Sequence, residues 1–178
     1  LMAGQSGLRL SLAGAQGKVP IIVKDGQISL PLNNSASTHI LKPEPQRFPG
    51  LAANETFCMV LAKKVGLDVA EIEYRQLAEH KFVLVKRYDR EIVEGGEVIR
   101  LHQEDFCQAL GYPPERKYQV EGGPTVKECV QLIWDWSSIP ALDLTDFMKR
   151  LVFNTLIGNA DAHGKNFSYL YQGSERRI

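Results

Sequence analysis

The chain has 178 residues, 44% of them hydrophobic, and its 21 Lys and Arg residues balance its 21 Asp and Glu residues. This size and composition predict one globular domain or two small lobes, and the zero net charge argues against a strongly basic nucleic-acid surface. No apolar run approaches the roughly 18 residues that a membrane span needs, so we expect no membrane-embedded part.

The first half of the chain is predicted to be mostly β-strand. The expected strands cover residues 19–23, 27–30, 38–42, 71–77 and 81–88, with a further hairpin around residues 95–96. Asp25-Gly26 separates the first two runs, and such a pair between apolar runs is a strong hairpin signal. One helix interrupts the strands, because residues 54–65 carry apolar side chains at helical spacing and Gly66 follows as a natural stop.

The second half is predicted to be mostly helical. The expected helices cover residues 103–110, 125–136 and 144–157, and an aromatic strand is expected at 167–171. Thr125 and Glu128 form a capping-box pattern at the start of the second helix, whereas Asp143 is the expected cap of the third and Gly158 its stop. The composition changes near residue 101, so we predict a β-rich unit at 1–100 and a helical unit at 101–178.

The cysteines and one tryptophan have expected places in the core. Cys58, Cys107 and Cys129 are odd in number and lack metal-site spacing, so they fit neither a disulfide framework nor a zinc site. Because all three fall in apolar helical patterns, we expect buried thiols in a reducing cytoplasm. Trp134 is likewise expected to pack in the core.

The densest polar cluster follows the last helix, at residues 158–166. Asp161 and Asn166 have the D-x-x-x-x-N spacing of a protein-kinase catalytic loop. In such a loop a carboxylate accepts or orients the proton of the attacking hydroxyl, and an amide oxygen reaches a magnesium ion. Taken alone the pattern is equally that of a surface turn, because Asn, Asp and Gly favour turns.

Three other segments have both a functional and an ordinary interpretation. Small residues at 11–18 suit a phosphate-binding loop or a flexible terminus, and Leu12 and Val19 exclude a Walker A motif. Lys42 and Glu55 could form the strand-to-helix pair of a kinase or a solvent-exposed pair. Residues 81–90 could present backbone groups to an adenine ring or be an ordinary buried strand.

Seven segments, in order, resemble motifs of the HipA family of serine/threonine protein kinases, which are toxins of bacterial toxin–antitoxin pairs. They are Ser11-Leu-Ala-Gly-Ala-Gln16, Thr38-His-Ile-Leu-Lys42, Asn54-Glu55, Val85-Lys-Arg-Tyr-Asp-Arg90, Gln103-Glu-Asp-Phe-Cys-Gln108, Lys117-Tyr118 with Gly122-Gly-Pro124, and Asp161-Ala-His-Gly-Lys-Asn166. Seven ordered motifs are far more specific than any one of them.

The resemblance implies an α+β, protein-kinase-like two-lobed fold, with a β-rich N-lobe holding one helix and a partial α-rich C-lobe, and it implies ATP and Mg²⁺ as cofactors. Asp161 would be the catalytic base, Asn166 a magnesium ligand and Glu55 the ion-pair partner of Lys42. The residues implied at the nucleotide are Ala13, Gly14, Ala15, Gln16, Gly17, Lys18, Lys42, Lys86, Arg87, Tyr88, His163, Gly164, Lys165 and Asn166. Residues 86–88 would be the adenine-contacting hinge, acting mainly through backbone.

Regulation and partners are implied in the same way. Ser11 matches the family's autophosphorylation site, where a phosphate would add a charge of about −1.5 to −2 and could eject the loop. The family's substrates are aminoacyl-tRNA synthetases, notably glutamyl-tRNA synthetase. Its partner is a HipB-type antitoxin, through which the kinase meets DNA only indirectly.

The chain departs from the family pattern in two ways. Gly17 stands where an acidic residue often precedes the lysine. The family's second magnesium ligand, an aspartate expected shortly beyond Ile178, has no counterpart, and the chain resembles a piece truncated at both ends. We therefore expect residues 1–178 alone to have little or no kinase activity. The alternatives are an inactive antitoxin-binding module and a small-molecule kinase of aminoglycoside-phosphotransferase type, against which residues 11–16 and 103–108 argue.

Overall fold

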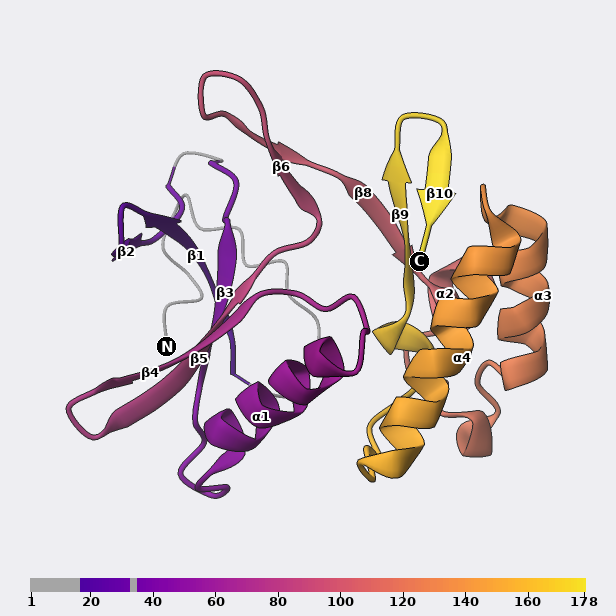
Figure 1. Ribbon diagram of the computed structural model, residues 1–178, viewed down its shortest axis with the longest axis horizontal. Coiled ribbons are helices and arrows are strands. Elements are labelled where there is room, and N and C mark those ends of the chain that lie inside the picture. The colour runs from indigo at the N-terminus through magenta and orange to yellow at the C-terminus, as the bar shows by residue number, and fades with distance from the viewer. Residues whose placement is uncertain (1–16, 33–34) are drawn as a thin grey trace. The chain divides into compact units, whose positions relative to one another are not determined.

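The computed structural model of the chain describes residues 17–32 and 35–178 (Figure 1). Two compact units are distinguished, with the boundary between Arg100 and Leu101. In the described part of the chain, no helix has the length and apolar character to cross a membrane.

The first unit is built on a five-stranded antiparallel sheet with the strand order β2-β1-β3-β5-β4. Its strands are β1 (Val19–Lys24), β2 (Gln27–Ser29), β3 (His39–Pro43), β4 (Ile72–Leu77) and β5 (His80–Lys86). Ile21, Val83 and Leu84 are almost fully buried in it. The predicted strands are confirmed, although β5 ends at Lys86, two residues earlier than expected.

The hairpin signal at Asp25-Gly26 is confirmed. Lys24 pairs with Gln27 across the turn, and the φ angles of Asp25 and Gly26 are +50° and +76°. A two-residue turn with positive φ at both positions matches the twist of the two strands, and glycine adopts such a φ without a Cβ clash.

Helix α1 (Leu51–Lys64) packs against β4 and β5 and buries Ala52 and Ala62. The helix begins three residues before the predicted Asn54, because its N-terminus is capped from outside the helix. The Glu44 carboxylate accepts a hydrogen bond of 3.1 Å from the Ala52 backbone N–H. The predicted stop is confirmed, since Gly66 follows the helix with a φ of +87°.

A short hairpin of β6 (Arg90–Ile92) and β7 (Val98–Arg100) completes the first unit. It reverses at Gly95 and Gly96, which both have positive φ, as the sequence predicts.

The second unit combines a three-stranded antiparallel sheet, in the order β10-β9-β8, with helices. Its strands are β8 (His102–Asp105), β9 (Ser168–Gln172) and β10 (Glu175–Arg177), its α-helices α2 (Phe106–Ala109), α3 (Val126–Trp136) and α4 (Pro140–Leu156), and its 3₁₀ turns η1 (Gln119–Glu121) and η2 (Gly164–Asn166). The core consists of Phe106, Cys129, Leu132, Ile133, Phe147 and Tyr169.

The predicted helix over 103–110 is wrong in its first half. Residues 102–105 pair with β9 as strand β8 instead. Helix α2 begins only at Phe106, because Asp105 and Gln108 form a reciprocal capping box, with hydrogen bonds of 3.0 Å in both directions.

Of the two caps predicted for the next two helices, one is confirmed and one is wrong. The capping box of α3 is confirmed, since Thr125 accepts from the Glu128 N–H and Glu128 accepts from the Thr125 N–H. The predicted cap of α4 is wrong, because the helix already begins at Pro140, where a missing N–H costs nothing. Asp143 instead lies inside the helix, 1% exposed, and accepts hydrogen bonds from Ser137 and Arg177.

The expected thiol burial is confirmed for Cys107 and Cys129, while Cys58 is half-buried, and all three are free. Burial raises the pKa of Cys129 to about 12, so this thiol is inert. The expectation for Trp134 is wrong, because its side chain is 62% exposed. Trp136, on the face of α3 that carries Cys129, Leu132 and Ile133, packs against the core instead.

Candidate active site

The loop that carries Asp161 is fastened to the end of α4. Gly158 follows the helix with a φ of +68°, which turns the chain. The Asn159 side chain then donates to the Asn154 side chain (3.0 Å) and accepts from the Asp161 N–H (3.2 Å). The position of Asp161 is therefore set by a rigid helix end through one asparagine.

The Asp161 carboxylate is held on one side and open on the other. The Tyr118 hydroxyl donates a hydrogen bond of 2.5 Å to Oδ1 of Asp161, and Nε2 of His163 lies 3.6 Å from the same oxygen. The Asp161 side chain is nevertheless 73% exposed. An oriented, solvent-accessible carboxylate is what a general base or a proton-orienting group requires.

The His163 side chain lies on the buried side of this loop. Its side chain is 9% exposed, its ring lies edge-on to the Tyr118 ring at 4.9 Å, and its buried Nδ1 makes no hydrogen bond within the described part of the chain. Burial, and then the charge of Lys117, lower the pKa of His163, and the opposing effect of Asp161 is smaller. The neutral imidazole therefore leaves the charge of Asp161 uncompensated.

The loop is packed tightly at Gly164. The Gly164 N–H donates to the Lys117 carbonyl (3.1 Å). A Cβ at this position would lie 2.9 Å from Sγ of Cys107 and 2.9 Å from Cγ of Pro124, which is closer than real contacts allow. Only glycine fits here without displacing α2 or the segment 116–124.

That segment is itself held by a second glycine. The Gly123 N–H donates to the Tyr118 carbonyl (2.9 Å), and a Cβ at Gly123 would lie 2.5 Å from the Arg116 carbonyl oxygen. Lys117 and Tyr118 are thus fixed relative to the Asp161 loop, although residues 111–124 lack periodic pattern.

Lys165 has a structural partner. Its Nζ donates a hydrogen bond of 2.6 Å to Oδ2 of Asp105, and both side chains are largely buried. The other oxygen of Asp105 caps α2. Any contact of Lys165 with a nucleotide stays a prediction, and the ion pair with Asp105 is a role that the sequence did not indicate.

Asn166 ends the loop in the short turn η2. Its N–H donates to the His163 carbonyl (2.9 Å), and its side chain is exposed. An amide oxygen is a hard ligand that suits Mg²⁺. Among residues 17–32 and 35–178, no group of three or more His, Cys, Asp and Glu could hold a metal. A single amide donor such as Asn166 fits a Mg²⁺ ion that takes most of its ligands from phosphates and water.

Within the first unit, two lysines and one glutamate lie near one another. Lys42 on β3 forms an ion pair with Glu55 on α1, and both side chains are about three-quarters buried. Burial and then the charge of Lys42 lower the pKa of Lys18, against a smaller opposing effect of Glu55. Two ammonium groups near one carboxylate leave a net positive charge that suits phosphate.

Five residues of the proposed phosphate loop lie outside the described part of the chain. They are Ser11, Ala13, Gly14, Ala15 and Gln16.

The predicted hinge, Lys86, Arg87 and Tyr88, leaves the end of β5. The Lys86 N–H donates to the Glu71 carbonyl, and the Arg87 N–H to the Thr38 carbonyl, both at 2.9 Å. The segment is therefore fixed by main-chain bonds to both neighbours of β5. The Tyr88 side chain is 56% exposed.

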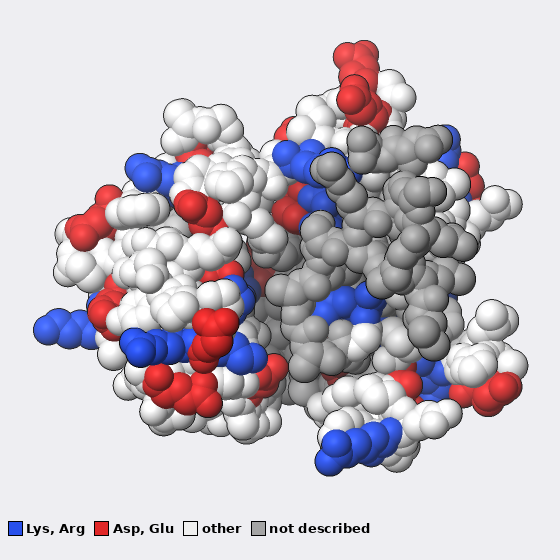
Figure 2. All heavy atoms as spheres, turned by 180° about the vertical axis from the view of Figure 1, so that it is seen from behind, with Lys and Arg blue, Asp and Glu red and all other residues white. Residues whose placement is uncertain are grey.

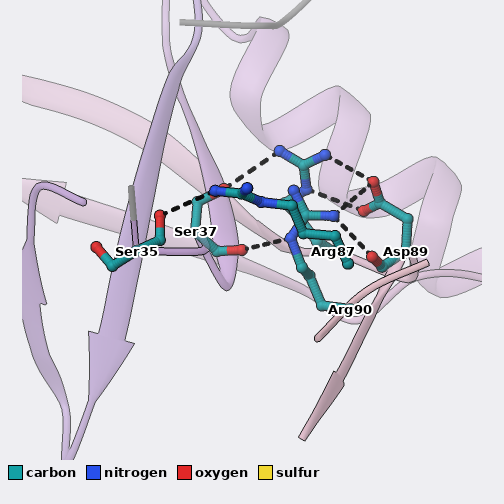
Figure 3. A network of polar contacts seen from close by, with 6 residues as sticks. Ser35, Ser37, Arg87, Asp89 and Arg90 are labelled. Carbon is teal, nitrogen blue, oxygen red and sulfur yellow. Dashed lines mark hydrogen bonds and ion pairs between the residues drawn. The ribbon is translucent and has the colours of Figure 1, made fainter. Parts of the chain in front are cut away.

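A buried ionic network that includes Arg87 holds the hinge in place (Figure 3). Arg87 donates to both carboxylate oxygens of Asp89, at 2.9 and 2.7 Å, and Arg90 donates to Oδ2 at 2.9 Å. Arg87 also reaches Oγ of Ser37, and Arg90 its carbonyl oxygen. Burial alone would raise the pKa of Asp89, but the two arginines outweigh it and the pKa lies below its usual range.

Figure 2 shows one face of the molecule, on which acidic and basic side chains are interspersed rather than gathered by sign. The mixture agrees with the balanced composition.

Comparisons with known proteins cover almost the whole chain. The model of the HipA-like C-terminal domain family matches residues 10–178. A putative kinase of Sinorhizobium fredii, Y4mE, is 56% identical over 171 residues, which are 96% of this chain and 41% of that protein. The serine/threonine-protein kinase toxin HipA of Shewanella oneidensis is 34% identical over 172 residues, 90% of this chain and 39% of that protein.

A solved structure agrees with these sequence matches. In a complex of HipA, HipB and operator DNA from Shewanella oneidensis MR-1, one chain is 32% identical and superposes with a TM-score of 0.79, over 95% of this chain and 42% of that one. The present chain spans about two fifths of the length of the curated relatives that it matches.

Proposed function

Since the chain belongs to the HipA-like C-terminal domain family, we propose that it carries nucleotide-binding and catalytic segments of an ATP-dependent serine/threonine protein kinase. The observation that carries the proposal is Asp161, an exposed carboxylate oriented by Tyr118, in a loop that ends at the exposed amide of Asn166. Relatives named as kinases, one of them a serine/threonine-protein kinase toxin, support the reaction class.

The proposed reaction transfers the γ-phosphoryl group of ATP to a hydroxyl. The acceptor oxygen bonds to the γ-phosphorus as the bond from the γ-phosphorus to the β–γ bridging oxygen breaks, and ADP leaves. Asp161 takes the hydroxyl proton. Lys18 and Lys42 face the phosphates, with Lys42 held by Glu55. Asn166 would hold Mg²⁺, which neutralises phosphate charge when bound. Backbone groups of residues 86–88 contact the adenine.

The partners belong to the same proposal. A HipA chain in complex with HipB and operator DNA has a similar structure, which supports a HipB-like antitoxin as partner and an indirect association with DNA. An aminoacyl-tRNA synthetase is the proposed acceptor, and Ser11 the proposed site of autophosphorylation. Both follow from the motif resemblance.

Phosphotransfer from [γ-³²P]ATP to a serine acceptor tests the proposal in the gene product that contains this chain. We expect Asp161→Asn to lower the rate about 10²- to 10⁴-fold, since the asparagine amide cannot take the hydroxyl proton. Asp146→Asn is the matched control, because Asp146 is a solvent-accessible carboxylate on α4 that pairs with Lys149. Equal activity of Asp161→Asn and wild type would exclude the proposed role.

A further inference from the structure

Tyr118, which the proposed chemistry does not use, hydrogen-bonds to the carboxylate of the proposed base. Its hydroxyl reaches Oδ1 of Asp161 at 2.5 Å, across 43 positions of sequence. A hydroxyl that donates to a carboxylate makes one of the stronger kinds of hydrogen bond in proteins, because the acceptor is charged.

The phenol is placed by a rigid surrounding. The Tyr118 carbonyl accepts from the Gly123 N–H, its ring lies edge-on to the His163 ring, and Nζ of Lys117 lies 4.9 Å from its centroid. The preceding carbonyl, of Lys117, accepts from the Gly164 N–H. The phenol and the Asp161 loop are therefore held by the same backbone bonds, so the position of the hydroxyl relative to the carboxylate is fixed before substrate binds.

The hydrogen bond from Tyr118 makes the two carboxylate oxygens of Asp161 inequivalent. Oδ1 accepts from Tyr118, whereas Oδ2 accepts no hydrogen bond from any residue in 17–32 or 35–178. The hydrogen bond to Asp161 raises the pKa of Tyr118, so the phenol stays protonated and donating at neutral pH. A neutral donor orients the carboxylate without cancelling its charge, which an arginine or lysine would do.

We propose that Tyr118 is a positioning residue of the phosphotransfer step, which holds Oδ1 of Asp161 so that Oδ2 is presented to the acceptor hydroxyl. This inference rests on the proposed function. In the step itself, the proton of the acceptor hydroxyl passes to Oδ2, its oxygen bonds to the γ-phosphorus, and ADP carries away the electrons of the broken bond. Tyr118 neither gains nor loses a proton.

The kinetic test is Tyr118→Phe in the gene product that contains this chain. The variant keeps the ring and its contact with His163 and loses only the hydroxyl. A hydrogen bond to a charged group contributes enough that we expect kcat to fall about 10- to 100-fold, with KM for ATP unchanged, because the phenol acts on the base and not on the nucleotide. In an Asp161→Asn background, Tyr118→Phe should cause no further loss.

Tyr112→Phe is the matched control. Tyr112 lies in the same unit and also donates to a carboxylate, Glu128, at 2.8 Å, but that carboxylate caps α3. We expect its kcat to equal that of wild type. An unchanged kcat in Tyr118→Phe, an equal loss in Tyr112→Phe, or an additive loss in the Asp161→Asn background would overturn the inference. An active Asp161→Asn variant would instead overturn the proposed function.

A second measurement needs no activity. In protein labelled with [¹³Cζ]tyrosine, with the Tyr118 signal assigned from its loss in Tyr118→Phe, we expect the phenol to titrate at lower pH in Asp161→Asn than in wild type. The same titration midpoint in both proteins would show that the hydrogen bond is absent in solution, and the inference would fall.

Discussion

Asp89 sits almost fully buried between two guanidinium groups, and its side chain and those of Arg87 and Arg90 are each 7–10% exposed. Such a cluster is stable only while complete, because removing one partner leaves charges without a counterion in a poorly solvated place. The three residues tie the start of β3 to the exit of β5 through Ser37.

We expect Asp89→Ala to lower the free energy of unfolding by about 3–5 kcal/mol, measured by urea denaturation. Glu73→Ala is the control, because Glu73 also forms a two-bond pair with an arginine, Arg75, but in an exposed position. Exposed pairs contribute at most about 1 kcal/mol. Similar losses in both variants would show that the buried network has no special contribution to stability.

His163 makes stability depend on pH. Its pKa is lowered in the folded chain, first by burial, so between its folded pKa and the usual value near 6.5 the unfolded state binds more protons. This contribution to stability is present above pH 6.5 and is lost as pH falls through the folded pKa. We expect the free energy of unfolding to fall less between pH 7 and pH 5 in His163→Gln than in wild type. Parallel pH profiles would contradict this assignment.

At the scale of single residues, the sequence pointed to those candidate site residues whose proposed roles depend on their spacing along the chain. Asp161 and Asn166 were found from five positions of separation behind a helix, and their roles stay predictions. Tyr118 could not be found as a contact of Asp161, because it lies 43 positions away in a segment without periodicity. The buried position of Asp143 was missed for the same reason, since Arg177, one of its two partners, lies 34 positions away.

At the scale of elements, two glycines lock the segment 116–124 to the Asp161 loop. We expect Gly123→Ala to destabilise the chain by about 1–3 kcal/mol, the usual cost of overpacking, because its Cβ would meet the Arg116 carbonyl at 2.5 Å and backbone cannot rotate away. Thermal unfolding measures the loss. Gly17→Ala is the control, since a Cβ there meets no atom of residues 17–32 or 35–178 within 4 Å, and an equal loss in both variants would contradict the steric reason.

Elements with local signals were predicted and those with distant partners were not. The Asp25-Gly26 turn and the Thr125–Glu128 capping box were predicted from residues at most three positions apart, and both are confirmed. Strand β8 was mistaken for helix, because only its pairing with β9, more than 60 positions later, makes it a strand. The start of α1 was misplaced because the side chain that accepts from the Ala52 N–H in its first turn is Glu44, eight positions earlier.

For the whole molecule, the α+β, protein-kinase-like fold predicted from ordered motifs is confirmed by the structural match to HipA at a TM-score of 0.79. The ordered motifs were sufficient for this, because they involve many residues and survive errors at single element boundaries. The three-stranded sheet of the second unit was not foreseen, since β8 is remote in sequence from β9 and β10.

The two units each have buried apolar residues of their own, and both tryptophans lie on α3 in the second unit. In the 178-residue chain, we expect Val83→Ala to move the urea transition seen by circular dichroism but not that seen by tryptophan fluorescence. Removing these two buried methyl groups costs about 2 kcal/mol. Ile133→Ala, in the other core, should move the fluorescence transition. A fluorescence shift in Val83→Ala would show that the units unfold together.

The bond between Lys165 and Asp105 has a consequence for natural variation. One carboxylate oxygen of Asp105 caps α2, and the other accepts a hydrogen bond from the Lys165 ammonium group. A substitution of Asp105 or of Lys165 alone would therefore leave a largely buried charge without its partner. Among homologous sequences the two positions should substitute as a pair, and a lineage that loses the acid at one should also lose the base at the other.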